Sequence, residues 1–257
     1  MKIFDGLFHP SFDQETELLN LIEGLKNRYN VHGALAVPLP GQVNDINSYI
    51  ASCSKFEFFK PVGLFDPHLK KVEEQVKNFK EARCIAIKIH PRFSCWDWTS
   101  SRGLKVFGDL IDKCEQYELP ILFCTYFSTV KGHSLISDPL YLLGDLFSKF
   151  NKVKLVLLHG GCERILQYLE FFRYWDNVLI DISYTLTRYE GSSVDLDLSF
   201  AFKHLDRKVS FGSDSPYCDY DTLIAKLKKL ADNADLEFNS EKMDNILYNN
   251  IKNFLNI

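Results

Sequence analysis

Eight short apolar segments alternate along the chain with longer segments of helical periodicity. The apolar segments, rich in β-branched residues, are residues 2–8, 33–38, 61–65, 83–89, 119–125, 153–158, 178–183 and 208–212. Between them, apolar residues recur at i, i+3, i+4 and i+7, as in residues 16–29 and 103–117, which predicts amphipathic helices. A strict alternation of strands and helices indicates a parallel sheet with helices packed against it.

Eight such units favour a closed (β/α)8 barrel, an α/β fold that takes about 250 residues. The chain has 257 residues, and an open, doubly wound sheet is the alternative. The sequence contains no internal repeat, low-complexity tract or linker. We therefore expect residues 1–257 to form a single barrel domain.

The boundaries of several elements carry local signals. Asp66, Ser101 and Asp138 precede helical segments and are candidate N-caps. Residues 127–137 and 184–197 are expected to be loops. Residues 241–257 have a helical pattern and are expected to pack back on the barrel.

Composition and charge exclude several classes of partner. The net charge is −4, with lysine and arginine scattered rather than clustered, so nothing indicates binding to nucleic acid or to an anionic membrane. The seven cysteines form no CxxC pair, which is typical of reduced thiols. No signal peptide or spanning apolar stretch is evident. We expect a cytoplasmic protein that binds a small molecule, and the aromatic residues 171–175 permit a homodimer.

Polar and ionisable side chains gather at the C-terminal ends of the expected strands. They are His9, Asp66, His68, Lys88, His90, Cys124, His159, Asp181, Ser183 and Asp214. In a (β/α)8 barrel these ends meet at one face, where active sites lie. Imidazole and carboxylate are also the usual ligands of a catalytic zinc, which keeps one position open for water. We interpret His9, His159 and Asp214 as a functional set.

Structural roles are the simpler interpretation for other members. His68 can cap the third helix, and Cys124 is typical of a small buried hydrophobic residue. Lys88 can pair with a carboxylate, and Asp181 can anchor the backbone. The remaining histidines fall in expected loops or helices; they are His32, His133 and His204.

Several of these segments resemble motifs of the amidohydrolase superfamily, in its branch of amidohydrolase-related, metal-dependent hydrolases. IFDGLFHP is similar to the first-strand motif Asp-x-His-x-His, and CIAIKIHP to the fourth-strand Gly-x-Lys-x-His-Pro. LVLLHGG is similar to the sixth strand with its His-x-Gly-Gly end, and VSFGSDSP to the eighth-strand Phe-Gly-Ser-Asp-x-Pro. The resemblance runs along nearly the whole chain, and FGSDSP is its most specific part.

The resemblance implies roles for three residues. His9 matches the second histidine of the first-strand pair, which is a metal ligand. His159 matches a histidine that binds metal or polarises the substrate. Asp214 matches the aspartate that binds metal and takes the proton of the attacking water. The implied cofactor is one divalent metal, zinc before others.

Two positions depart from the family pattern. Leu7 stands where the first histidine of the pair is expected, and Cys124 stands where the fifth strand often carries histidine. Leucine cannot bind metal, and a thiolate is a soft ligand that changes the metal preference. A catalytic zinc normally has three protein ligands, so the chain is expected to hold metal weakly or to work without it.

These features together lead to one main hypothesis for function. The chain is expected to hydrolyse a small, carboxylate-bearing amide, lactone or ester, with Asp214 activating water and His159 or His90 polarising the carbonyl. Positive charge for the substrate would come from Lys88, Arg92 and Arg188. A decarboxylase of the same branch is one alternative, and a non-catalytic barrel that binds a small molecule is another.

Overall fold

The computed structural model describes residues 1–13, 15–41, 43, 45–69, 71–126 and 139–257. Its strands are β1 (Ile3–Phe8), β2 (Val31–Ala36), β3 (Phe59–Leu64), β4 (Ala86–Ile89), β5 (Ile121–Cys124), β6 (Leu155–Leu158), β7 (Val178–Asp181) and β8 (Val209–Ser210). They form one sheet in which each strand pairs in parallel with the next along the chain. A doubly wound sheet would reverse its strand order at a switch point, so this order excludes that alternative.

The two edges of the sheet meet, because the chain after β8 hydrogen-bonds to β1. The Gly6 amide donates to the Phe211 carbonyl at 3.0 Å, and the Asp214 amide donates to the Leu7 carbonyl at 2.8 Å. An isolated parallel bridge also joins Phe8 and Ser215. These contacts close the sheet into the expected (β/α)8 barrel.

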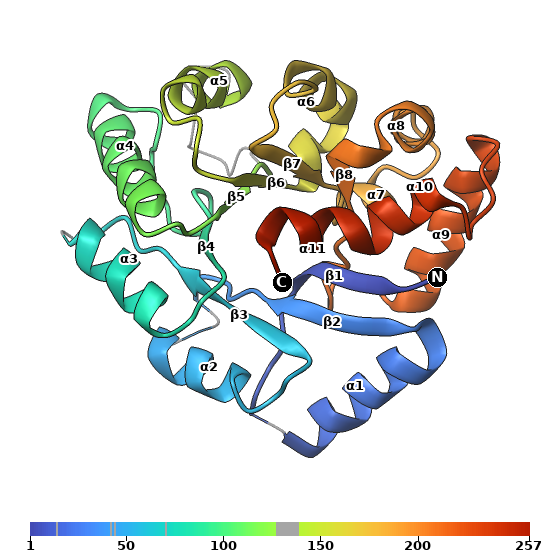
Figure 1. Cartoon of the computed structure of the whole chain (residues 1–257), viewed down its shortest axis with the longest axis horizontal. Coiled ribbons are helices and arrows are strands. Elements are labelled where there is room, and N and C mark those ends of the chain that lie inside the picture. The colour runs from blue at the N-terminus through green and yellow to red at the C-terminus, as the bar shows by residue number, and fades with distance from the viewer. Residues whose placement is uncertain (14, 42, 44, 70, 127–138) are drawn as a thin grey trace.

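Helices surround the strands, as Figure 1 shows. They are α1 (Glu15–Tyr29), α2 (Ile46–Cys53), α3 (Val72–Glu81), α4 (Ser101–Gln116), α5 (Pro139–Lys149), α6 (Ile165–Phe171), α7 (Thr185–Arg188), α8 (Val194–His204), α9 (Tyr220–Asn233), α10 (Glu241–Asp244) and α11 (Asn250–Leu255). Each longer helix buries one stripe: α4, for example, buries Phe107, Leu110 and Ile111. This packing is what the helical periodicity of the sequence predicts.

Apolar side chains fill the inside of the barrel. The last helix, α11, closes the end of the barrel at which the strands begin. Leu35, Val62 and Leu122 belong to one buried cluster inside the strands, and Ile251 and Leu255 of α11 join the same cluster. Figure 1 shows α11 lying across the strands. The expected packing of residues 241–257 is confirmed, with a π-helical turn between α10 and α11. The polar residues therefore lie at the opposite, open end.

Two of the predicted helix caps are wrong. The cap of α4 is Ser100, whose hydroxyl accepts from the Gly103 amide at 3.1 Å, and not Ser101, which is the first helical residue. Asp66 does not cap α3, which begins at Val72. Its carboxylate instead accepts from the amide two residues later, the turn that aspartate favours.

The predicted loops have a mixed outcome. Residues 184–197 are not a loop, since they contain α7 and the start of α8; helices this short leave little periodicity to detect. The predictions for residues 127–137, and for Asp138 and His133, lie outside the described residues.

The cysteines and the helices fit the compositional expectations. All seven cysteines are free thiols, as predicted. Within the described part of the chain, no helix has the length and apolar character needed to cross a membrane.

Candidate active site at the barrel mouth

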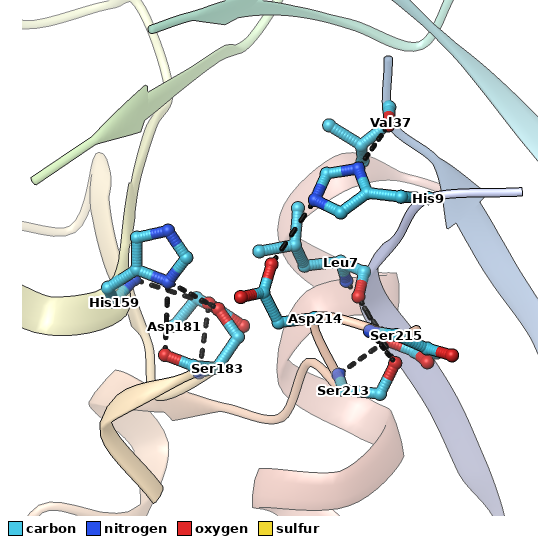
Figure 2. Close-up of polar contacts among 10 residues, drawn as sticks. Leu7, His9, Val37, His159, Asp181, Ser183, Ser213, Asp214 and Ser215 are labelled. Atoms are coloured by element: carbon cyan, nitrogen blue, oxygen red, sulfur yellow. Dashed lines mark hydrogen bonds and ion pairs between the residues drawn. The ribbon is translucent and has the colours of Figure 1, made fainter. Parts of the chain in front are cut away.

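The C-terminal ends of β1, β6 and β8 bring together His9, His159 and Asp214, and Figure 2 shows the two imidazoles on either side of the carboxylate. Backbone contacts fix part of this arrangement. Asp214 is held against β1 by its amide, and the His9 amide donates to the Ser215 carbonyl at 3.0 Å. His159 and Asp214 both have positive φ, 66° and 54°, which turns the chain sharply at the end of each strand. All three side chains are nearly buried.

The hydrogen bonds of His9 determine which ring nitrogen carries its proton. Nδ1 contacts the Val37 carbonyl oxygen, which can only accept, so Nδ1 is the protonated nitrogen. Nε2 lies 3.2 Å from Asp214 Oδ1 and presents its lone pair to the carboxylate. A proton or a cation shared by the two atoms would stabilise this contact.

The charges of this pair follow from burial and from Lys88. Burial lowers the pKa of His9 to about 4, and the positive charge of Lys88 adds to that effect. Burial alone would raise the pKa of Asp214, but the contact with His9 and the charges of His159 and Lys88 outweigh it and leave that pKa below its ordinary value. At neutral pH the imidazole is neutral and the carboxylate is ionised.

The His159 ring is oriented by a contact with the chain that follows β7. Its Nδ1 lies 3.1 Å from the Ser183 carbonyl oxygen, so Nδ1 donates and Nε2 faces the mouth. Burial opposes its charged form, but the Cys124 thiol, which is hydrogen-bonded to the ring, and the Asp214 carboxylate raise the pKa of His159 above its ordinary value. Burial likewise opposes the thiolate, but His159 and Lys88 lower the pKa of Cys124. Cys124 is thus a buried partner of His159 and more than a space-filling residue.

Asp181 and Ser183, at the end of β7, hold His159 in place through hydrogen bonds. Asp181 Oδ1 accepts from the amides of His159 and Ser183, at 3.4 and 3.1 Å, and from the Ser183 hydroxyl. Burial raises the pKa of Asp181 to about 7. The interpretation of Asp181 as a backbone anchor therefore agrees with the structure.

Asp5 is a supporting carboxylate that the sequence analysis missed. It lies within β1, and its carboxylate accepts from the amides of Leu7 and Ser213, at 3.1 and 2.8 Å, and from the Tyr220 hydroxyl. Burial raises its pKa to about 6. The signal in the sequence is an acid inside the apolar run IFDGLF, away from the strand ends where the other site residues lie.

Lys88 lies on β4, and His90 directly follows that strand. The His90 ring stacks on Phe93 with centroids 4.4 Å apart, and its Nδ1 accepts from the Phe93 amide at 3.3 Å. Burial and Lys88 lower the pKa of His90 to about 2, so the ring is neutral and its Nε2 carries a proton to donate. Burial lowers the pKa of Lys88 to about 8.

The two predicted arginines differ in environment. The Arg92 guanidinium lies between the rings of Phe93 and Tyr126, 5.1 and 4.7 Å from their centroids. Its Nε is buried and has no hydrogen-bond partner among the described residues. Arg188, at the end of α7, is exposed. The structure thus brings Arg92 beside His90, while Arg188 lies on the surface.

Other candidates lie away from the centre of the mouth. His68 is exposed and its ring contacts the Ser94 carbonyl oxygen at 2.6 Å, so it neither caps α3 nor joins the site. His32 and His204 pack on surface aromatic rings.

The donor set only partly fits a catalytic metal. His9 presents an unprotonated Nε2 fixed by a backbone contact, as zinc-binding histidines do, and Asp214 supplies a carboxylate beside it. Over the described ranges, however, no group of three or more His, Cys, Asp or Glu side chains could hold a metal ion. Leu7 accounts for one missing donor. The residues present do not complete a three-ligand zinc site.

The fold and the grouped imidazoles and carboxylate define the class of protein: a (β/α)8 barrel with a polar site at the C-terminal ends of its strands. The sequence profile described as amidohydrolase matches residues 39–257. The chain therefore belongs to the amidohydrolase family, as its motifs suggested. The match begins after β1, so it does not test the expected roles of Leu7 and His9.

Solved structures share the whole barrel at low sequence identity. An uncharacterized TIM-barrel protein from Bordetella bronchiseptica is 15% identical with a TM-score of 0.76, and the alignment covers 100% of this chain and 99% of that one. A probable 2-pyrone-4,6-dicarboxylic acid hydrolase from Acinetobacter baumannii, with citric acid bound, is 14% identical with a TM-score of 0.67 and full coverage of both chains. A 4-oxalomesaconate hydratase from Rhodopseudomonas palustris is 15% identical with a TM-score of 0.62, covering 99% of this chain and 95% of that one. No curated protein matches the chain by sequence.

Proposed function

We propose that the protein is a hydrolase of a small, carboxylate-bearing amide, lactone or ester, in which Asp214 takes the proton of the attacking water. One observation carries this proposal: an ionised, nearly buried carboxylate lies 3.2 Å from the lone pair of a neutral imidazole at the barrel mouth. A water donating to either atom is oriented and made more nucleophilic. Such general-base catalysis contributes about 10²–10⁴-fold.

Two imidazoles can act on the carbonyl oxygen of the substrate. His90 is neutral with its proton on Nε2, so it can donate a hydrogen bond. His159 has a raised pKa, so the nitrogen that faces the mouth takes a second proton more readily than that of an ordinary imidazole. Either donor would stabilise the negative charge that develops on the carbonyl oxygen.

The positive groups support a substrate that carries carboxylate. Lys88 and Arg92 are both close to His90, and the buried Arg92 Nε has no hydrogen-bond partner among the described residues. A buried donor without a partner is costly, and a substrate carboxylate would satisfy it. The similar structures named for a pyrone dicarboxylate and for oxalomesaconate point to the same substrate class.

A divalent metal, zinc first, is part of the proposal only as a weakly held ion on His9 and Asp214. No step above requires it, since the carboxylate activates water and protein donors act on the carbonyl. Metal analysis of protein purified without chelator would measure its occupancy. The predicted homodimer and the cytoplasmic location stay predictions.

The substitution Asp214→Asn tests the proposal. We expect wild-type protein to open the lactone of 2-pyrone-4,6-dicarboxylate or a related small lactone, amide or ester, and Asp214→Asn to lose about 10²–10⁴-fold in rate. Asp221→Asn, an exposed aspartate paired with Arg28 at 2.7 Å, is the matched control and should keep full activity. Thermal unfolding of both variants would check that the fold is intact.

Two results would contradict the proposal. Undiminished hydrolysis by folded Asp214→Asn would remove Asp214 from the reaction. Binding of such compounds without turnover by the wild type would favour the non-catalytic barrel instead.

A further inference from the structure

Lys88 is a buried lysine that lacks a counter-ion in the described part of the chain. The residue is 1% exposed, and no described carboxylate oxygen lies within the 4.0 Å of an ion pair. No hydrogen bond to its amine is found among those residues either. Lys226 is the natural comparison: it is 4% exposed, but its Nζ lies 2.7 Å from Asp195 Oδ1 and 3.5 Å from Glu190 Oε1.

The amine of Lys88 lies inside the barrel, near its open end. Alternate residues of a strand share a face, and Ala86, two residues earlier on β4, belongs to the apolar cluster that fills the barrel. Lys88 is therefore one step closer to the mouth on the same face. Its charge acts on His9, His90 and His159, which follow three different strands at the open end of the barrel.

An unpaired buried amine is disposed to lose its proton. Transfer of an ammonium away from water is costly when no carboxylate neutralises it. Burial accordingly lowers the pKa of Lys88 to about 8, against the opposing effects of Cys124, Asp214 and Asp181. At pH 7 roughly a tenth of the molecules hold a neutral amine, about 10²-fold more than for an ordinary lysine. Neutral amines attack carbonyl groups.

We propose that Lys88 is a carbonyl-reactive amine that forms an imine with small oxo acids entering the barrel mouth. The nitrogen lone pair forms a bond to the carbonyl carbon while the C=O π pair moves to oxygen. That oxygen then leaves as water with the two protons that the nitrogen gives up, which solvent can relay, and a C=N bond remains. The balance is one amine and one carbonyl compound giving one imine and one water.

Arg92, whose charge acts on His90, selects acids among carbonyl compounds. It follows Lys88 by four residues, just past the end of β4, and its buried Nε lacks a hydrogen-bond partner among the described residues. A carboxylate next to the reacting carbonyl would pair with this guanidinium. This activity uses the same mouth as the proposed hydrolysis, but it does not depend on Asp214 as a base.

Reductive trapping tests the proposal on the full-length protein. The protein is incubated at pH 7 with pyruvate and sodium cyanoborohydride, and modification of each lysine is measured by peptide mass spectrometry. We expect Lys88 to be labelled at least about tenfold faster than Lys226, whose amine is held by Asp195 and Glu190. Lys88→Arg should abolish that label, and Asp214→Asn should keep or increase it, because the charge of Asp214 raises the pKa of Lys88; this separates the inference from the hydrolase proposal.

The comparison within the wild type needs no variant to fold. Equal labelling of Lys88 and Lys226, or a label spread only over exposed lysines such as Lys152, would overturn the proposal. Acetone in place of pyruvate examines the role of the carboxylate, and labelling of Lys88 as fast with acetone as with pyruvate would overturn the selection by Arg92.

Discussion

At the scale of single residues, the site depends on which atoms carry protons. His9 is fixed with its proton on the side of Val37, and Asp214 faces the other ring nitrogen at 3.2 Å. The chemistry follows from that one contact, because it places two proton acceptors at the same point. The positive charge of Lys88 lowers the pKa of both groups.

Replacing Leu7 by histidine should restore a third metal donor. Leu7 lies two residues before His9 on the same face of β1, and Figure 2 shows it beside Asp214. We expect Leu7→His to tighten zinc binding by on the order of tenfold or more, measured by competition with a chromophoric chelator. Leu7→Met, which has similar volume and no imidazole, is the control. Equal affinities of both variants would mean that the geometry differs from that of a three-ligand site.

Asp181 should make the protein less stable as the pH rises. Its pKa is about 7 in the folded protein and near 3.8 when unfolded, so the folded state binds the proton more tightly. Stability from this group is complete below about pH 4 and is lost as the pH rises through about 7. Asparagine mimics the protonated acid, so Asp181→Asn should gain up to about 4 kcal/mol over the wild type between pH 4 and pH 8.

Urea unfolding at a series of pH values would measure this difference. The exposed Asp221→Asn variant should shift stability by no more than about 1 kcal/mol. A constant difference between wild type and Asp181→Asn across the range would show that Asp181 is ionised in the folded protein.

Sequence reasoning located the site residues because each one follows a strand. His9, His159 and Asp214 could be named without coordinates, since parallel strands must end at one face. Asp5 could not, because a carboxylate within a strand is recognised only when its partners, such as Tyr220, are known to be near. The pairing of Cys124 with His159 was equally hidden, since it joins residues of neighbouring strands through side-chain direction alone.

At the scale of elements, apolar periodicity predicted all eight strands but not their exact ends. The segment 208–212 contains β8, which is only Val209–Ser210, because the following residues turn away to place Asp214 beside β1. Helix starts were less predictable, since several polar residues stand together before each helix and only one has the geometry of a cap.

The start of α4 gives a direct test of that distinction. Ser100 caps the helix through the Gly103 amide, so Ser100→Ala should cost about 1 kcal/mol of the free energy of unfolding. Ser101, the cap that the sequence suggested, is exposed, and Ser101→Ala should change stability by less than about 0.5 kcal/mol. Chemical denaturation compares the two, and a larger loss for Ser101→Ala would reverse the assignment.

At the scale of the whole molecule, the apolar residues that stabilise the barrel and the polar residues of the candidate site lie at opposite ends. The cluster that contains Val62, Leu122 and Ile251 fills and closes one end, while the imidazoles and carboxylates lie at the other. The barrel could be predicted from the order of the elements, because alternating strands and helices leave few topologies. Substrate identity could not, because it depends on the loops around the mouth.

The central claim is that the His9 and His159 imidazoles both face Asp214 at the barrel mouth, and the titration of the two histidines by NMR in wild type and Asp214→Asn tests it most directly. Asp214 raises the pKa of both imidazoles, so its neutralisation should lower both pKa values, while Asp221→Asn should leave them unchanged. If either imidazole titrates as in the wild type after Asp214→Asn, that histidine does not face the carboxylate, and the proposed site is contradicted.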